Sequence, residues 1–262
     1  MRSRAAPTMM ALTEPWRIGG RALKICMLYC TLIIVQPTPD NEDTERDPLL
    51  PERQALCRTV AGLAAQGWCQ GTGGNFSVTL GHEPLRLLIT SSGVHKRHLA
   101  PEHLMVIGPE GRPVDGETGR PSAEALLHAR IVEATGAGSV LHVHSVANTL
   151  LGEHFVERGG FVLRGYEMLK GLEGITTHEA EVFVPVLRNS QDMPALAGEV
   201  GRLLAERPGR PGQFGLHGFL LSGHGLYAWG ASLEQAHRHV EIFEFLFECA
   251  ARRTRFEPFT GL

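Results

Sequence analysis

The chain has 262 residues, of which 43% are hydrophobic and 20% are charged, as is typical of a single globular α/β domain. Its formal net charge is -3 and it contains no basic block, so nothing in the sequence indicates a nucleic-acid partner. The five cysteines form neither a Cys-x-x-Cys pair nor a disulfide framework. We therefore expect a protein of a reducing, cytoplasmic compartment.

The N-terminal part of the chain differs in character from the rest. Residues 22–35 (ALKICMLYCTLIIV) are largely apolar and follow several arginines, as in a signal peptide or a membrane anchor. However, this run is shorter than the roughly 20 residues that cross a bilayer, and no Ala-x-Ala-like cleavage site follows it. We therefore expect no membrane partner. We interpret residues 1–47 as a dispensable extension or a start codon assigned too early, residues 48–256 as the main domain and residues 257–262 as a tail.

Helical and strand patterns alternate along the main domain. Apolar residues at helical spacing predict a helix over residues 49–67. The glycine-rich loop GTGGN (71–75) leads into a predicted hairpin with strands at 76–80 and 85–90. The polar loop TSSGVHK (90–96) precedes a short helical turn and a strand at 105–108.

The second half of the chain continues this alternation. Ser122 is expected to cap a helix that ends near Thr135, and Ser232 is expected to cap the last helix. A run interrupted by glycines, FLLSGHGLYAWG (219–230), is expected to be one broken strand. The remaining predicted elements are strands at 139–144, 161–163 and 181–187, and helices at 145–151, 166–172, 193–205 and 232–253. Because no Gly-x-Gly-x-x-Gly fingerprint is present, the pattern favours a layered α/β domain over a Rossmann fold.

Three histidines are candidate metal ligands. His142 and His144 alternate with a valine in the predicted strand, and residues i and i+2 of a strand project from the same face. This pair alone also fits two polar side chains facing a crevice. His224, however, lies between two glycines that allow the backbone to bend and leave the side chain uncovered. Because a catalytic zinc ion takes three protein ligands and keeps one open position, the three histidines predict a zinc site.

Two loops have the composition of an anion-binding site. GTGGN and TSSG supply backbone N–H groups in glycine-rich turns, together with hydroxyl groups, and Ser122 lies downstream of them. Either loop alone is more often only a turn. Lys96 and Lys170 are candidate sources of positive charge, although an exposed lysine is usually only solvated. In combination, these segments predict that a phosphate group binds here.

Two glutamates are candidate acid/base groups. Glu124 begins the helix that precedes the histidine strand, where the helix N-terminus favours its ionised form. Glu167 lies in GYEMLKG, among apolar neighbours that are expected to raise its pKa towards the range useful for general acid/base catalysis. The alternatives are a simple first-turn acid for Glu124 and an ordinary surface glutamate for Glu167.

Several segments, in this order, resemble the class II aldolase/epimerase/adducin-head family over about residues 54–250: GTGGNFSV, ITSSGVHK, PSAE, HVHS and SGHGLYAWG. Two further segments, EMLKG (167–171) and EVFVPVLRNSQD (181–192), are most similar to the sugar-phosphate dehydratases of that family. The resemblance implies a three-layer α/β/α class II aldolase-like domain with a central mixed, largely antiparallel sheet. It also implies a homotetramer with active sites near the subunit boundaries.

The resemblance also implies roles for individual residues. One zinc ion per subunit would bind to His142, His144 and His224. Gly74 would shape the phosphate loop, and the phosphate would be held by Asn75, Ser92, Gly93 and Ser122. Ala123 departs from the pattern of the aldolases, which tend to have a second phosphate-binding serine there. The missing donor would then be lost or replaced, with Lys96 and Lys170 as the candidates.

The reaction implied by the resemblance is the dehydration of a phosphorylated ketose, with metal stabilisation of an enolate. In the dehydratases the acid/base role belongs to the glutamate of EMLKG, here Glu167, whereas in the aldolases it belongs to the one at the position of Glu124. The first alternative is therefore a sugar-phosphate aldolase or epimerase, of the fuculose-phosphate or ribulose-phosphate type. A remote alternative is a non-catalytic, adducin-head-like interaction module, in which the metal ligands tend to be lost.

Overall fold

The computed structural model describes residues 17–18, 21–22, 47–114, 116–209 and 215–253. The chain divides into two units, Met1–Asp47 and Pro48–Leu262. In the first unit, β1 (Arg17–Ile18) and β2 (Arg21–Ala22) pair antiparallel. Apart from Ala22, the apolar N-terminal run lies outside the described residues, as does the C-terminal tail. The interpretation of the first unit as a dispensable extension stays a prediction.

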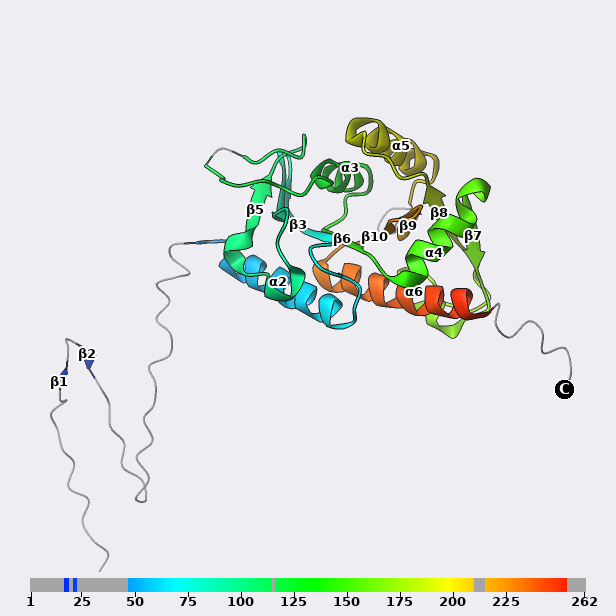
Figure 1. Ribbon diagram of the computed structural model, residues 1–262, viewed down its shortest axis with the longest axis horizontal. Helices are drawn as coiled ribbons and strands as arrows, with labels where there is room; N and C mark the ends of the chain where they lie inside the picture. The colour runs from blue at the N-terminus through cyan, green and yellow to red at the C-terminus, as the bar shows by residue number, and fades with distance from the viewer. Residues whose placement is uncertain (1–16, 19–20, 23–46, 115, 210–214, 254–262) are drawn as a thin grey trace, which may run out of the picture. The chain divides into compact units, whose positions relative to one another are not determined.

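The second unit contains an eight-stranded sheet in the order β5-β4-β3-β6-β10-β9-β8-β7 (Figure 1). Neighbouring strands are antiparallel except for the parallel pair β8 and β9. The predicted mixed, largely antiparallel sheet is therefore confirmed. Its strands are β3 (Asn75–His82), β4 (Leu85–Thr90), β5 (Leu104–Ile107), β6 (Ser139–Val143), β7 (Gly160–Leu163), β8 (Val182–Leu187), β9 (Gly218–Leu221) and β10 (Gly225–Gly230).

Helices cover both faces of this sheet, which makes the three predicted layers (Figure 1). One face packs on α2 (Leu50–Ala65), α4 (Val146–Phe155) and α6 (Leu233–Arg253), and the other on α3 (Ala125–Thr135) and α5 (Met193–Glu206). Side chains alternate between the two cores along β6: Leu141 and Val143 face α2, α4 and α6, whereas Val140 faces α3 and α5. His142 therefore projects to the α3 side. Among the described residues, no helix has both the length and the apolar character needed to cross a membrane.

The glycine-interrupted run at 219–230 is a hairpin, so the prediction of one broken strand was wrong. Strands β9 and β10 pair antiparallel, with Gly225 opposite Leu221. The turn between them contains Gly223 at φ +64° and His224. A tight turn needs a residue that tolerates positive φ, which glycine does without strain. His224 thus sits in the turn of a hairpin in the middle of the sheet, at the end of the strands where β6 also ends.

Capping confirms one expectation and corrects another. The Ser232 hydroxyl accepts a hydrogen bond from the Gln235 N–H at 3.2 Å, as expected of a helix cap. Helix α3, however, begins after Glu124, and Ser122 lies before its N-cap position. The Ser122 hydroxyl instead accepts from the Glu124 N–H at 3.3 Å, which holds the chain just ahead of the helix. The helix predicted at 166–172 is a short 3₁₀ segment, η4 (Glu167–Gly171).

The buried His239 on α6 is expected to make stability depend on pH. Its Nδ1–H donates to the Trp229 carbonyl at 2.6 Å, and its Nε2 accepts from the Glu173 N–H at 3.1 Å. Burial lowers the pKa of His239 to about 4, and the charged forms of nearby His217 and Arg238 lower it further. The unfolded chain, with a histidine pKa near its ordinary 6.5, then binds a proton that the folded chain does not.

Stability is therefore expected to fall as pH falls from 6.5 towards 4, and His239 contributes about 1.4 kcal/mol per pH unit in this window. Urea unfolding at a series of pH values measures the slope. In His239→Leu the slope of the unfolding free energy against pH should be smaller by about that amount. An unchanged slope would show that His239 is not held neutral by the fold.

Candidate metal centre and active site

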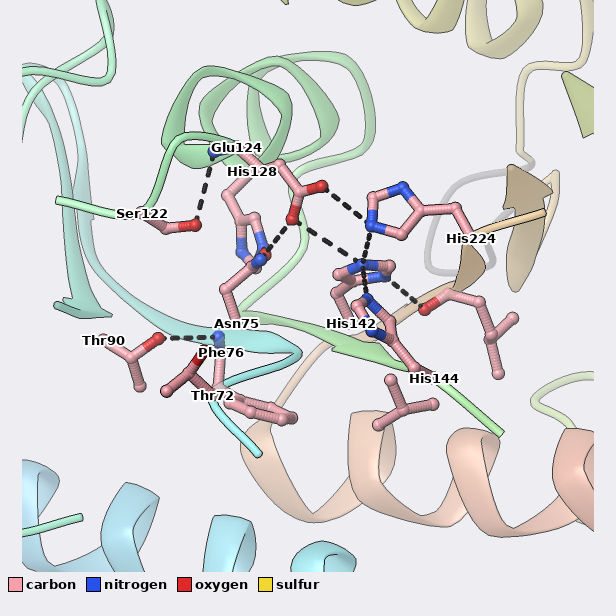
Figure 2. Close-up of polar contacts among 12 residues, drawn as sticks. Thr72, Asn75, Phe76, Thr90, Ser122, Glu124, His128, His142, His144 and His224 are labelled. Carbon is pink, nitrogen blue, oxygen red and sulfur yellow. Dashed lines mark hydrogen bonds and ion pairs between the residues drawn. The ribbon is translucent and has the colours of Figure 1, made fainter. Parts of the chain in front are cut away.

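The three predicted metal ligands converge at one end of the sheet (Figure 2). The Nε2 atom of His142 lies 2.7 Å from Nε2 of His144 and 3.4 Å from Nε2 of His224. Nitrogens bound at about 2.0–2.1 Å to one tetrahedral ion lie roughly 3.3–3.4 Å from one another. The His142–His224 spacing matches this value, whereas the His142 and His144 nitrogens lie closer together and would move apart around a bound divalent cation. The three ligand atoms all lie within 4.8 Å of one another, and the predicted convergence of the histidines is confirmed.

Neighbouring groups hold His142 in the form that binds a metal. Its Nδ1–H donates to the Leu226 carbonyl at 2.9 Å, which leaves Nε2 free to use its lone pair. The ring stacks on Tyr227, with centroids 3.9 Å apart. Burial, followed by the charged forms of His144 and His224, lowers the pKa of His142 well below its ordinary value. Burial also lowers the pKa of His144 to about 4, so both rings are neutral ligands at neutral pH.

The Glu124 carboxylate faces the histidines from the N-terminus of α3 (Figure 2). Its Oε1 lies 3.1 Å from Nε2 of His224, and its Oε2 lies 3.6 Å from Nε2 of His142. The Asn75 amide donates to Oε2 of the same carboxylate. Of the two predicted acid/base residues, Glu124 is therefore the one that contacts the histidines within the chain.

Sequence reasoning missed two buried residues that support Glu124. His128 contacts the Asn75 amide, and Ser77 contacts His128. The spacing of both residues along their strand or helix could have indicated them. Ser77 follows Asn75 by two residues on β3, and His128 follows Glu124 by four residues on α3, so each pair shares a face.

The predicted phosphate loops lie beside the histidine site. Gly74 has φ +80°, and a Cβ atom there would lie 2.7 Å from the His142 carbonyl oxygen, so the approach of this loop to β6 requires glycine. Ser92 and Gly93 are exposed in the loop after β4. The Ser92 N–H donates to the Arg120 carbonyl at 3.0 Å, which brings this loop against the segment that leads to Ser122.

Lys96 is buried, so the alternative of an exposed lysine that is only solvated does not apply to it. Only 2% of its surface is exposed, and burial lowers its pKa. Its ammonium group donates to the Thr72 carbonyl at 2.9 Å and to the Val94 carbonyl at 3.0 Å. Thr72 belongs to GTGGN and Val94 directly follows TSSG, so Lys96 connects the two predicted anion loops.

Glu167 is not among the residues that meet at the three histidines. The expectation that apolar neighbours raise its pKa was wrong. Its side chain is 68% exposed and pairs with Lys170 and with His178. The hydrogen bond from Lys170 lowers the pKa of Glu167. Segment η4 packs along α6 at Gly171, and within the described residues no hydrogen bond or ion pair connects Glu167 or Lys170 with the three histidines.

Comparison with known proteins places these residues in a family. The profile of the class II aldolase and adducin N-terminal domain matches residues 54–251. A methylthioribulose-1-phosphate dehydratase from Methylococcus capsulatus is 41% identical over 211 residues, covering 80% of this chain and 96% of the relative. The protein of the same name from Xanthomonas campestris is 43% identical over 197 residues, covering 75% of this chain and 86% of the relative.

Solved structures agree on the fold. An L-fuculose-1-phosphate aldolase from Thermus thermophilus superposes with a TM-score of 0.62 at 26% identity, over 79% of this chain and 98% of the other. A sugar-phosphate aldolase from Thermotoga maritima superposes with a TM-score of 0.55 at 16% identity, over 80% of this chain and 96% of the other, a likeness that concerns the fold alone. The chain is a member of the class II aldolase and adducin N-terminal domain family.

Proposed function

We propose that the protein is a cytoplasmic hydro-lyase that dehydrates 5-methylthioribulose 1-phosphate to 2,3-diketo-5-methylthiopentyl 1-phosphate in methionine salvage. The observation that carries this proposal is the 41–43% identity to relatives named methylthioribulose-1-phosphate dehydratase over 86–96% of their length. The complete set of His142, His144 and His224 beside Glu124 supports a catalytic rather than an adducin-like role.

We assign zinc, one ion per subunit, as the metal that the three histidines would hold. Three neutral imidazole nitrogens with an open fourth position are the ligand set of a catalytic zinc site. When bound, zinc supplies Lewis acidity next to the carbonyl oxygen of the substrate. The Leu226 carbonyl serves as a supporting group, because it accepts from Nδ1 of His142 and leaves Nε2 for the metal. Glu124 faces the Nε2 atoms of His224 and His142 themselves, so its carboxylate lies on the side of the site where the metal would bind.

The proposed phosphate site consists of the two loops beside the histidines. Backbone N–H groups in glycine-rich turns and serine hydroxyls can surround a phosphate without a Walker motif. We therefore retain Asn75, Ser92, Gly93 and Ser122 as candidate phosphate contacts, with Gly74 shaping the loop. Lys96 has a different role in this proposal. Its ammonium group donates to carbonyl oxygens of Thr72 and Val94 and so holds the two loops together, without a contact to the phosphate.

The proposed reaction needs a group that removes the proton from C3 of the substrate while hydroxide leaves from C4 and departs as water. The resulting C3 enol then gains a proton at C4 and loses one from its hydroxyl to give the diketone. We propose Glu167 for the C3 proton. Because Glu167 is exposed and, among the described residues, makes no hydrogen bond or ion pair with the three candidate metal ligands of its own chain, it would act in the site of a neighbouring copy of a homotetramer.

A class II aldolase or epimerase reaction is the second candidate, and one observation favours it. Glu124, not Glu167, contacts the histidines within the chain, as the aldolase assignment requires. The two functions predict different products. Purified protein should form the diketone from methylthioribulose 1-phosphate and should leave L-fuculose 1-phosphate unchanged. Cleavage or epimerisation of a sugar phosphate, with no diketone formed, would favour the second candidate.

Lys96→Met is expected to weaken substrate binding. The change removes two charge-assisted hydrogen bonds that hold the loops together, each worth about 1.5–3 kcal/mol. Without these bonds, part of this energy has to be spent on ordering the loops when substrate binds. KM for methylthioribulose 1-phosphate should therefore rise roughly 10-fold, while the zinc content stays the same. Arg97→Gln removes an exposed positive charge from the next residue and serves as the control. Equal KM increases in both variants would indicate a general effect of charge and not loop positioning.

A further inference from the structure

A chain of hydrogen bonds runs from the middle of the sheet to the Glu124 carboxylate. Ser77 Oγ lies 2.8 Å from Nδ1 of His128, and Nε2 of His128 lies 2.5 Å from Oδ1 of Asn75. The Asn75 amide nitrogen donates to Oε2 of Glu124. Figure 2 shows Asn75, His128 and Glu124 meeting at the N-terminus of α3.

The donor and the acceptor of each hydrogen bond between Ser77 and Glu124 can be assigned by starting from Glu124. The Asn75 atom that faces Glu124 is the amide nitrogen, which donates to Oε2 of the carboxylate. The Asn75 oxygen then faces His128 and must accept, so Nε2 of His128 carries the proton. The remaining nitrogen, Nδ1, accepts from the Ser77 hydroxyl. All three donors therefore point towards Glu124.

Packing keeps His128 in this neutral form. Its side chain is completely buried, and burial lowers its pKa to about 3. The edge of the Tyr227 ring lies against it, with centroids 5.9 Å apart. A neutral histidine in one tautomer supplies one donor and one acceptor, and both are used. In this tautomer Nε2 donates, so turning the Asn75 amide over would place its NH₂ group against the Nε2–H and its oxygen against the Glu124 carboxylate.

We propose that His128 is a positioning residue for the reaction at the histidine site. Acting with Ser77, it locks the Asn75 amide with its NH₂ group towards Glu124, and this holds the carboxylate against His224 and His142. The second hydrogen of that NH₂ group stays available for substrate. This inference rests on the proposed function only where it concerns turnover; the tautomer of His128 is independent of it.

The kinetic test compares two buried histidines. His128→Leu is expected to lower kcat for methylthioribulose 1-phosphate about 10- to 100-fold, with KM changed less than about threefold and zinc content unchanged. His128→Gln retains an N–H donor and should recover part of kcat. His239→Leu removes an equally hydrogen-bonded buried histidine on α6 and should keep kcat within about twofold of the wild type. Wild-type kcat in His128→Leu, or equal losses in His128→Leu and His239→Leu, would overturn the proposal.

A second measurement needs neither activity nor stable variants. In wild-type protein labelled with ¹⁵N-histidine, the NMR shifts of His128 should report a neutral ring protonated on Nε2, retained when the pH is lowered to 5. A proton on Nδ1 would contradict the derived chain of donors. If the wild type failed to dehydrate methylthioribulose 1-phosphate, the proposed function would fall, while the Nε2 tautomer would still support the positioning of Asn75 and Glu124.

Discussion

His224→Ala is expected to remove the bound metal and to lower kcat/KM for methylthioribulose 1-phosphate at least about 1,000-fold. The nitrogens of His142 and His144 alone cannot complete the ligand set that a catalytic zinc ion requires. The loss of Lewis acid catalysis is worth several kcal/mol, and about 4 kcal/mol corresponds to three powers of ten in rate. Metal content by atomic emission and initial rates measure the two effects separately.

His237→Gln serves as the control for this variant. His237 lies on α6, where it pairs with Glu241 at 3.8 Å and takes no part in the histidine cluster. The control should keep both the metal and the activity. An active His224→Ala protein, with or without metal, would show that the three histidines are not the catalytic centre.

Glu167→Gln is expected to lower kcat about 100- to 10,000-fold, the usual contribution of a general acid or base, and to leave the metal in place. Gln keeps the size of the side chain but cannot take a proton from C3 of the substrate. Glu179→Gln, a change at an exposed glutamate downstream of η4, is the matched control and should be fully active. Full dehydratase activity in Glu167→Gln, with activity lost in Glu124→Gln, would transfer the acid/base role to Glu124.

Mixing the two inactive variants tests whether Glu167 acts in a neighbouring copy. In a His224→Ala chain Glu167 is intact, and in a Glu167→Gln chain the three histidines are intact. If each site combines residues of two chains, about a quarter of the sites in randomly mixed, equimolar oligomers are complete, and that fraction of wild-type activity should return. If Glu167 serves its own chain, no site in the mixture is complete and activity should stay absent.

Helices and strands could be predicted from the sequence where a single pattern of apolar residues covered a single helix or strand. Helix α2, the β3–β4 hairpin and α5 lie where the apolar spacing predicted them, within two residues at most ends. The hairpin of β9 and β10 did not follow, because both strands are buried on both sides and read as one apolar run. Its turn was visible only as the glycines around His224, which were interpreted as a break within a strand.

The metal ligands could be predicted because their spacing is local. His142 lies on β6 and His144 directly follows its last residue, and the glycines around His224 mark a turn. The surroundings of Lys96 and Glu167 depend instead on contacts with distant segments. Lys96 is buried because Thr72, 24 residues away, supplies a carbonyl acceptor. The apolar residues around Glu167, such as Leu169, turn into the core and leave the carboxylate outside.

The supporting residues were missed for a similar reason. His128 and Asn75 are 53 residues apart, and neither motif taken alone indicates that they meet. Shared-face spacing marks His128 as a neighbour of Glu124 and Ser77 as a neighbour of Asn75. Only the packing of α3 against β3 turns these two local pairs into one connected network.

The most direct test of the account is the reaction itself, carried out on the full chain. Protein containing one zinc ion per chain should convert methylthioribulose 1-phosphate into the 2,3-diketone 1-phosphate, followed by NMR. A chelator should stop the conversion, and added zinc should restore it. Metal-loaded, folded protein that leaves the substrate unchanged, or that cleaves or epimerises it without losing water, would contradict the assignment.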